Sequence, residues 1–154
     1  MTNKNNIHIL SRAVIIDQNY ILLCKTLDID FNFYYLPGGH VENGESVEAA
    51  LLRELLEESG AVCTTKRFLG CFEHSFKPGT NSICHNHEYN FIFEAESNSL
   101  KLHNTIPQLE DHIQLMWIPF AKIDQIDFRP VPLKRLLPRW LNANSNNMFE
   151  SVML

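Results

Sequence analysis

The segment GGHVENGESVEAALLRELLEESGAV, residues 38–62, constrains the fold of this 154-residue chain more than any other stretch. Gly60 is a typical residue just past the end of a helix, so the pattern predicts a helix from Ser46 to Ser59. At 100° per residue, the helix places its apolar side chains on one arc of roughly 160°. This predicted core face consists of Ala49, Leu51, Leu52, Leu55 and Leu56.

Three carboxylates share the neighbouring edge of the same helix. Glu54, Glu57 and Glu58 fall on an arc of roughly 100°, which also holds the small residue Ala50. Acidic runs are usually solvated, but like charges three or four residues apart destabilise a helix, and anions near its C-terminus oppose its dipole. A bound cation would offset both penalties. Carboxylate oxygens suit Mg²⁺, for which Mn²⁺ can substitute.

The spacing of polar residues and glycines in this segment resembles the signature of the Nudix hydrolase family. Gly39 is followed after five residues by Glu45, and seven further residues separate Glu45 from Arg53. Ala61 stands where the family usually has a larger aliphatic residue, a departure that affects packing rather than chemistry. The resemblance implies an α+β chain with the Nudix fold, an α/β/α sandwich with a central mixed β-sheet. The matching positions are Gly39, Glu45, Arg53, Glu54, Glu57, Glu58 and Gly60.

The resemblance also implies roles for individual residues. The metal ligands would be Glu54, Glu57 and Glu58, together with the backbone carbonyl of Gly38, where glycine lets the backbone approach closely. An ion pair between Arg53 and Glu45 would orient the loop against the helix, because an arginine fork on a carboxylate is rigid. Gly39 and Gly60 are structural positions of the motif.

The general base has two candidates. In the family it is either a motif glutamate, here Glu54, or a glutamate from a loop beyond the motif. Glu110 in PQLEDHIQ precedes the predicted strand that carries Trp117 and is the second candidate. Its alternative is an ordinary solvated loop acid.

Residues outside the motif are weaker candidates for substrate contacts. Arg12 interrupts an apolar strand and would either bind a phosphate or form a surface ion pair. Tyr35, like its neighbours Phe33 and Tyr34, would either stack on a nucleobase or pack in the core. Glu88 begins a strand that is expected to run past the carboxylates, in a supporting role.

The histidine-rich sequence around residue 87 is a further candidate. His85 and His87 would share one face of a strand, but zinc needs more ligands than the sequence groups with them. A role at the end of a strand or in a loop is the alternative. Glu73 and His74 are weaker candidates for a supporting role like that of Glu88.

The sequence as a whole predicts a single domain over residues 1–141. Residues 7–25 read as a hairpin, FNFYYL as a short strand, and residues 62–76, 88–96 and 113–119 as further strands. A short helix near FAKIDQI and a final helix begun by Pro132 follow. Residues 142–154 form a polar linker and an apolar tag, which either docks on the body, joins a partner subunit or is disordered.

Net charge limits the partners of the chain. With a net charge of −5 at pH 7, the chain is not expected to have a broad basic surface for an extended nucleic acid. The polar start, the absence of a long apolar run and the lack of cysteine pairs favour a soluble, cytoplasmic protein without membrane contact. A homodimer is compatible with the sequence.

These observations lead to one principal function and one alternative. The resemblance implies Mg²⁺-dependent hydrolysis of the pyrophosphate linkage in a nucleoside diphosphate joined to another group. The substrate would be ADP-ribose-like or a nucleoside triphosphate rather than capped RNA, for which no basic channel is evident. The alternative is a Nudix module that binds a nucleotide without cutting it, although such modules usually lose motif glutamates, and all three are present.

Overall fold

The larger of two β-sheets forms the centre of the molecule. The computed structural model describes residues 7–77, 86–142, 144 and 146–154. Parallel pairing of β1 with β7 and of β6 with β9, combined with antiparallel pairing elsewhere, makes the larger sheet mixed. In spatial order its strands are β5 (Gly38–His40), β1 (Ile7–Val14), β7 (His87–Glu96), β6 (Thr64–Ser75) and β9 (Phe149–Val152).

A smaller sheet is built around one central strand, β3 (Tyr20–Thr26). It pairs antiparallel with β2 (Ile16–Asp17), with β4 (Tyr34–Tyr35) and with β8 (Ile113–Pro119). A short 3₁₀ helix, η1 (Phe120–Gln125), follows β8. This second sheet was not predicted from the sequence.

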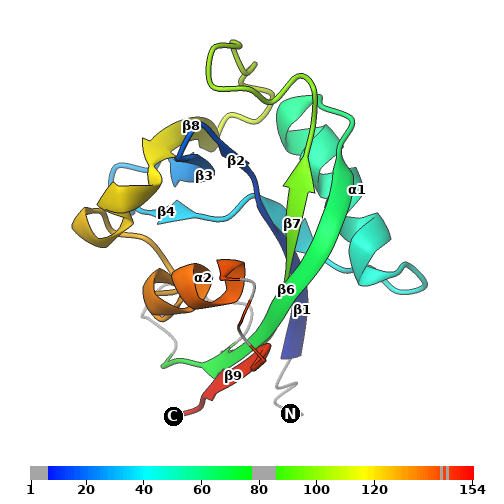
Figure 1. Cartoon of the computed structure of the whole chain (residues 1–154). Coiled ribbons are helices and arrows are strands. Elements are labelled where there is room, and N and C mark those ends of the chain that lie inside the picture. The colour runs from blue at the N-terminus through cyan, green and yellow to red at the C-terminus, as the bar shows by residue number, and fades with distance from the viewer. Residues whose placement is uncertain (1–6, 78–85, 143, 145) are drawn as a thin grey trace.

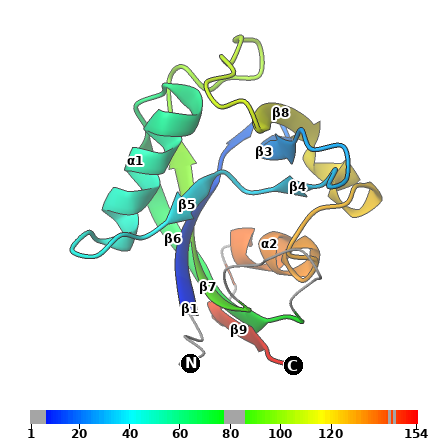
Figure 2. The ribbon, with the colours of Figure 1, turned by 180° about the vertical axis from the view of Figure 1, so that it is seen from behind.

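Helices cover both faces of the larger sheet. Helix α1 (Val47–Ser59) lies on one side, and helix α2 (Leu133–Leu141) lies on the other, beneath β3 and β4 (Figures 1 and 2). One core cluster joins α1 to the sheet through Leu51, Leu55 and Ala13. A second cluster joins α2 to both sheets through Trp140 of α2, Phe72 of β6 and Leu23 of β3. The predicted α+β fold with a central mixed sheet is therefore confirmed.

The predicted hairpin over residues 7–25 is wrong in its extent. Strand β1 pairs with β5 and β7, and the hairpin consists only of β2 and β3. Its two-residue turn has positive φ at Gln18 (49°) and Asn19 (66°), which matches the right-handed twist of the flanking strands. Between β1 and β2 the chain passes from one sheet to the other at Ile15, so β-branched residues predicted strands but not their partners.

The predicted bounds of α1 are confirmed. Ser46 caps its start by accepting a hydrogen bond from the Ala49 N–H, and Gly60 ends it with φ 71°. The predicted core face is wrong, because the buried side of α1 is rotated toward the edge that carries the glutamates. Ala50 and Glu58 are buried, whereas Leu56 is 49% exposed. The reason is that α1 packs on β5 and β1, so its glutamate edge, instead of its leucine arc alone, faces the sheet.

The apolar tag at the C-terminus forms a strand on the larger sheet, which is the first of the three alternatives given for it. Strand β9 pairs in parallel with β6, from Phe149 opposite Cys71 to Val152 opposite His74. Glu150 also forms ion pairs with Arg135 (3.0 Å) and Arg139 (3.2 Å) of α2. The tag therefore docks on the body of the same chain. Among the described helices, none is both long and apolar enough to cross a lipid bilayer.

Candidate active site

Gly38 lies in β5, where the backbone of the motif comes closest to α1. Its N–H donates a 3.0 Å hydrogen bond to Glu58 Oε2. Its φ of 129° is rarely adopted by residues with a side chain, and a Cβ here would lie 2.1 Å from the carbonyl oxygen of Ser11. Only glycine permits this close approach of two backbones.

Gly39 gives space to a second glutamate of the motif. A Cβ on Gly39 would lie 2.3 Å from Cδ of Glu54. The carboxylate of Glu54 thus packs directly against the glycine backbone. The two glycines and two of the glutamates in the signature are consequently one packing arrangement, in which each missing side chain makes room for a carboxyl group.

The predicted ion pair between Arg53 and Glu45 is present. Arg53 Nη2 lies 2.7 Å from Glu45 Oε1, and Nε lies 3.2 Å from Oε2, which is a two-pronged contact. Arg53 Nη2 also donates to the His40 carbonyl at 3.1 Å. The hydrogen bonds from Arg53 lower the pKa of Glu45, and those to Glu45 raise the pKa of Arg53. The helix, its preceding loop and β5 are thereby fixed to one another.

The three motif glutamates differ in exposure and in partners. Arg53 Nη1 contacts Glu54 at 3.0 Å and Glu57 at 3.5 Å. The side chain of Glu57 is 53% exposed, whereas that of Glu54 is 18% exposed. Glu58 is buried against Gly38. The edge of α1 therefore presents one buried, one half-buried and one exposed carboxyl group.

Burial raises the pKa of Glu58 to about 8. The charges of Glu54 and Glu110 act in the same direction within this shift, while Arg12 and the Gly38 N–H partly oppose it. A buried carboxyl group that faces other carboxylates is costly to ionise. A cation bound beside it would remove that cost.

The chemistry of these residues fits a hard divalent cation. Carboxylate oxygens and a backbone carbonyl are the ligands that Mg²⁺ prefers. On β1, the hydroxyl of Ser11 is fully buried without a hydrogen-bond partner, and Ser11 is paired with Gly39, the residue against which Glu54 packs. In the arrangement described, no three His, Cys, Asp or Glu side chains converge to ligate a metal, within the residues that the structure covers.

Glu110 lies close enough to this site for its charge to raise the pKa of Glu58. Its side chain is 29% exposed and its Oε2 lies 3.4 Å from His112 Nε2. The loop before β8 therefore brings the second candidate base toward the motif. Sequence reasoning identified Glu110 only from its place before a predicted strand.

Arg12 and Tyr35 lie together beside Gly38. Arg12 Nη1 donates to the carbonyl oxygens of Gly38 (2.9 Å) and Leu36 (3.2 Å), and its Cζ lies 5.4 Å from the centre of the Tyr35 ring. Tyr35 is paired with the buried Cys24, and burial raises the pKa of both side chains. Neither Cys24 nor Ser11 was identified from sequence. The only signal for Ser11 is a polar residue within an apolar strand.

Glu88 belongs to a different cluster. It accepts hydrogen bonds from His74 (2.5 Å) and Asn90 (3.0 Å). In the strand register it lies opposite His8, four residues along β1 from Arg12. On the other face, His87 Nε2 lies 3.0 Å from Glu73 Oε1. His85 lies outside the described residues.

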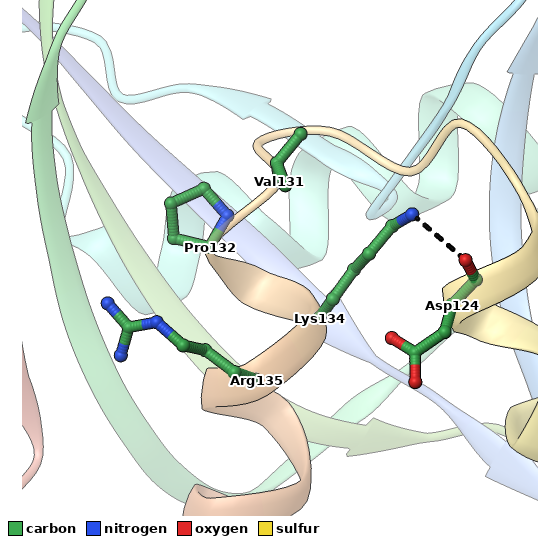
Figure 3. Close-up of a pocket in the computed structure, with 5 residues that line it drawn as sticks. All are labelled: Asp124, Val131, Pro132, Lys134 and Arg135. Carbon is green, nitrogen blue, oxygen red and sulfur yellow. Dashed lines mark hydrogen bonds between the residues drawn. The ribbon is translucent and has the colours of Figure 1, made fainter.

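A hollow of about 430 Å³ lies elsewhere, at the start of α2. Figure 3 shows Lys134 reaching across it toward Asp124, whose carbonyl it contacts at 3.4 Å. None of its lining residues belongs to the glutamate motif, so this hollow is separate from the candidate active site around Gly38. The lining residues are Asp124, Val131, Pro132, Lys134 and Arg135.

The raised pKa of Glu58 predicts a pH-dependent stability of the metal-free protein. Between the unfolded value of 4.5 and the folded value of about 8, the folded state holds the proton more tightly. Rising pH across this window should thus lower the free energy of unfolding, by an amount on the order of a few kcal/mol. Below pH 4.5 the contribution is fully present. Urea unfolding in EDTA from pH 5 to 9 measures it.

Glu58→Gln is the control for this prediction, because glutamine cannot titrate. The difference between the wild-type and Glu58→Gln curves isolates Glu58 from carboxyl groups such as Glu45, whose pKa is lowered. Parallel curves for the two proteins would show that Glu58 does not bind its proton more tightly after folding.

Comparisons with known proteins concern the family and the fold of the chain. A family model described as the NUDIX domain matches residues 8–140. An ADP-ribose pyrophosphatase from Methanocaldococcus jannaschii is 43% identical over 61 residues, covering 39% of this chain and 36% of that protein. An 8-oxo-dGTP diphosphatase from Proteus vulgaris is 33% identical over 78 residues, covering 49% and 70%. The match therefore spans about a third of the first of these relatives.

Solved structures share the fold over most of their length. The solution structure of the E. coli ORF135 protein has a TM-score of 0.69 at 20% identity, covering 96% of this chain and 99% of that one. The crystal structure of a MutT protein from Methanosarcina mazei Go1 has a TM-score of 0.70 at 19% identity, covering 93% and 99%. At these identities the likeness concerns the fold.

Proposed function

The chain belongs to the NUDIX family, and from this membership we propose that it hydrolyses a phosphoanhydride bond of a nucleotide. The observation that carries the proposal is the packing of Glu58 against Gly38 and of Glu54 against Gly39. Two motif carboxyl groups thus pack against the same short strand, β5, and Glu57 lies on the same edge of α1, which supports a shared metal site. A scaffold with a merely acidic helix would have no need of glycines that make room for carboxylates.

The residues that would hold Mg²⁺ are Glu54, Glu57, Glu58 and the carbonyl of Gly38, and Mn²⁺ would substitute for it. When bound, the metal neutralises phosphate charge and lowers the pKa of a water molecule. The chain's own contribution is to keep these oxygens in place. The Arg53–Glu45 pair fixes α1 to its preceding loop, and Gly38 holds Glu58 through its N–H.

Two glutamates are proposed as alternatives for accepting the proton of the attacking water. Glu54 is half-buried and in contact with Arg53. Glu110 lies on a separate loop, outside the motif, with its carboxylate partly exposed. Glu110 would act as a base without leaving a motif contact, whereas Glu54 would have to combine base catalysis with metal binding. Comparing kcat of Glu54→Gln and Glu110→Gln at saturating metal distinguishes the two.

The proposed substrate is a nucleoside diphosphate joined to another group, either ADP-ribose-like or a nucleoside triphosphate. The similarity to an ADP-ribose pyrophosphatase and to an 8-oxo-dGTP diphosphatase supports both choices. Arg12, Tyr35 and Glu88 remain the candidates for substrate contacts from the sequence, of which Arg12 and Tyr35 lie beside Gly38. Glu88 would act from the neighbouring cluster with His74.

A panel of nucleotides tests this proposal. We expect MgCl₂-dependent turnover of ADP-ribose or of at least one nucleoside triphosphate, with the two products identified by mass. The product masses show which bond breaks. Binding of a nucleotide without turnover of any compound would support the alternative, a module that senses a nucleotide. A lack of both turnover and any thermal shift with MgCl₂ would contradict both.

The proposal includes two further parts: the protein forms a homodimer, and it is located in the cytoplasm. Ile7, Ile9 and Phe149 are exposed, and the strand register places them on one face of the larger sheet. Exposed apolar groups of this kind often mark contacts between proteins. The mass of the protein in solution, measured by light scattering, tests the dimer. Cys24 and Cys63 are free and buried, which is consistent with a reducing compartment.

A further inference from the structure

We propose that Arg12 is a positioning residue that fixes the Gly38 carbonyl and thereby shapes the metal site of the proposed function, on which this inference rests. The sequence suggested either a phosphate-binding arm or a surface ion pair for Arg12. The structure points to a third role, because Arg12 Nη1 donates to two backbone carbonyls. One belongs to Gly38 in β5, and the other belongs to Leu36, two residues earlier.

The carbonyl contacts of Arg12 belong to a regular pattern. In an extended chain, successive carbonyls point in alternate directions. The Pro37 carbonyl accepts a 2.9 Å hydrogen bond from the Ala13 N–H of β1. The carbonyls on either side of it, those of Leu36 and Gly38, both accept from Arg12 Nη1. One side chain thus organises the two carbonyls that do not take part in this backbone contact.

The peptide groups of Gly38 are held from two sides. Glu58 Oε2 accepts from its N–H at 3.0 Å, and Arg12 Nη1 donates to its carbonyl at 2.9 Å. Glycine at a φ of 129° has many accessible conformations, so its own sterics do not fix the direction of the carbonyl. Together with the pairing of β5 and β1, the two side chains therefore hold the Gly38 peptide groups, so we expect a change at Arg12 to affect Glu58 through this single residue.

The surroundings of Arg12 keep its guanidinium in place. Its Cζ lies 5.4 Å from the centre of the Tyr35 ring, a distance at which a cation is attracted to the ring face. Strand pairing places Arg12 directly opposite Gly38, so the side chain needs no long reach. A planar donor held on a ring can contact two carbonyls at once, which the point charge of a lysine does less well.

The test measures metal binding without substrate and then the kinetics with it. Arg12→Gln should weaken the binding of Mn²⁺, followed by electron paramagnetic resonance, by about tenfold, the usual loss when a residue that orients ligands is removed. At saturating metal, kcat should fall while KM for the nucleotide stays within about twofold of wild type. Arg12→Lys should give an intermediate metal affinity. The amide of Gly38 should exchange its hydrogen faster in Arg12→Gln.

Arg67→Gln is the matched control. Like Arg12, Arg67 donates to a backbone carbonyl, that of Leu141 at 3.0 Å, and it pairs in addition with Glu94 at 2.7 Å. It lies on β6 of the same sheet, away from Gly38, so its replacement should leave Mn²⁺ affinity unchanged.

The outcomes separate this inference from the proposed function. A wild-type protein that binds no Mn²⁺ and cleaves no nucleotide refutes the proposed function itself. Wild-type activity combined with an unchanged Mn²⁺ affinity and a raised KM in Arg12→Gln overturns the positioning role and makes Arg12 a substrate contact. If Arg12→Gln does not fold, Arg12→Lys decides by the same two measurements: weaker metal binding supports the positioning role, and wild-type affinity overturns it.

Discussion

Glu57→Gln and Glu58→Gln are each expected to lower the rate of phosphoanhydride cleavage by at least about 100-fold while the protein stays folded. Each change removes the negative charge of a proposed metal ligand at the edge of α1 and keeps the size of the side chain. Glu57 is exposed, so its replacement cannot disturb the core. Glutamine at position 58 still offers an oxygen to the Gly38 N–H. Initial rates at saturating MgCl₂, with circular dichroism of each variant, measure both parts of the expectation.

Glu48→Gln is the matched control for these two variants. Glu48 lies in the first turn of the same helix and forms a hydrogen bond with Thr65 on the adjacent strand β6. Its replacement changes the helix charge by the same amount but should leave the rate unchanged. If Glu57→Gln, Glu58→Gln and Glu48→Gln all cleaved as fast as wild type, the assignment of the metal ligands would be wrong.

Gly38→Ala is expected to cause the largest loss of stability among the substitutions considered. The new Cβ would lie 2.1 Å from the Ser11 carbonyl oxygen and 3.0 Å from Arg12 Cα, and both are backbone atoms that cannot turn away. The φ of 129° adds strain for any residue other than glycine. We expect a cost above about 4 kcal/mol, in the range of the most damaging single substitutions. Urea unfolding and the loss of activity measure it.

A second glycine separates strain from collision. Gly44 also has positive φ (89°), but a Cβ there would meet no atom within 4 Å. Gly44→Ala should therefore cost only about 1 kcal/mol, the penalty for the backbone conformation alone. Equal costs for the two substitutions would mean that β1 and β5 do not approach each other as closely as described.

The local parts of the site were predictable from the sequence. Ser46, Gly60 and the spacing between them set the bounds of α1, because caps act within a few residues of the helix ends. The Arg53–Glu45 contact joins residues only eight positions apart. The spacing of the motif also predicted that its glutamates share one edge of the helix. Such features depend on short-range geometry, which the order of residues fixes directly.

Long-range partners decided the rest. The same apolar pattern in β1 would suit a hairpin with β3, yet β1 pairs with β7, some 80 residues later in the chain. In this position Ala13 packs in the core cluster of α1 and Val14 in the core cluster of α2. The glutamate edge of α1 faces the larger sheet because the helix packs on β5. Strand β9 docks on β6 through parallel pairing, and its Glu150 also contacts Arg135 and Arg139 of α2.

The sequence by itself thus determined the helix, its carboxylates and the brace that holds them, since these depend on neighbours along the chain. Only the tertiary structure decided which backbone the carboxylates face. It brought Ser11 and Arg12 of β1 beside Gly38 and Gly39, and it buried Glu58 so that its pKa rises to about 8. Contacts between distant segments depend on how the whole core packs, and no local spacing encodes that packing.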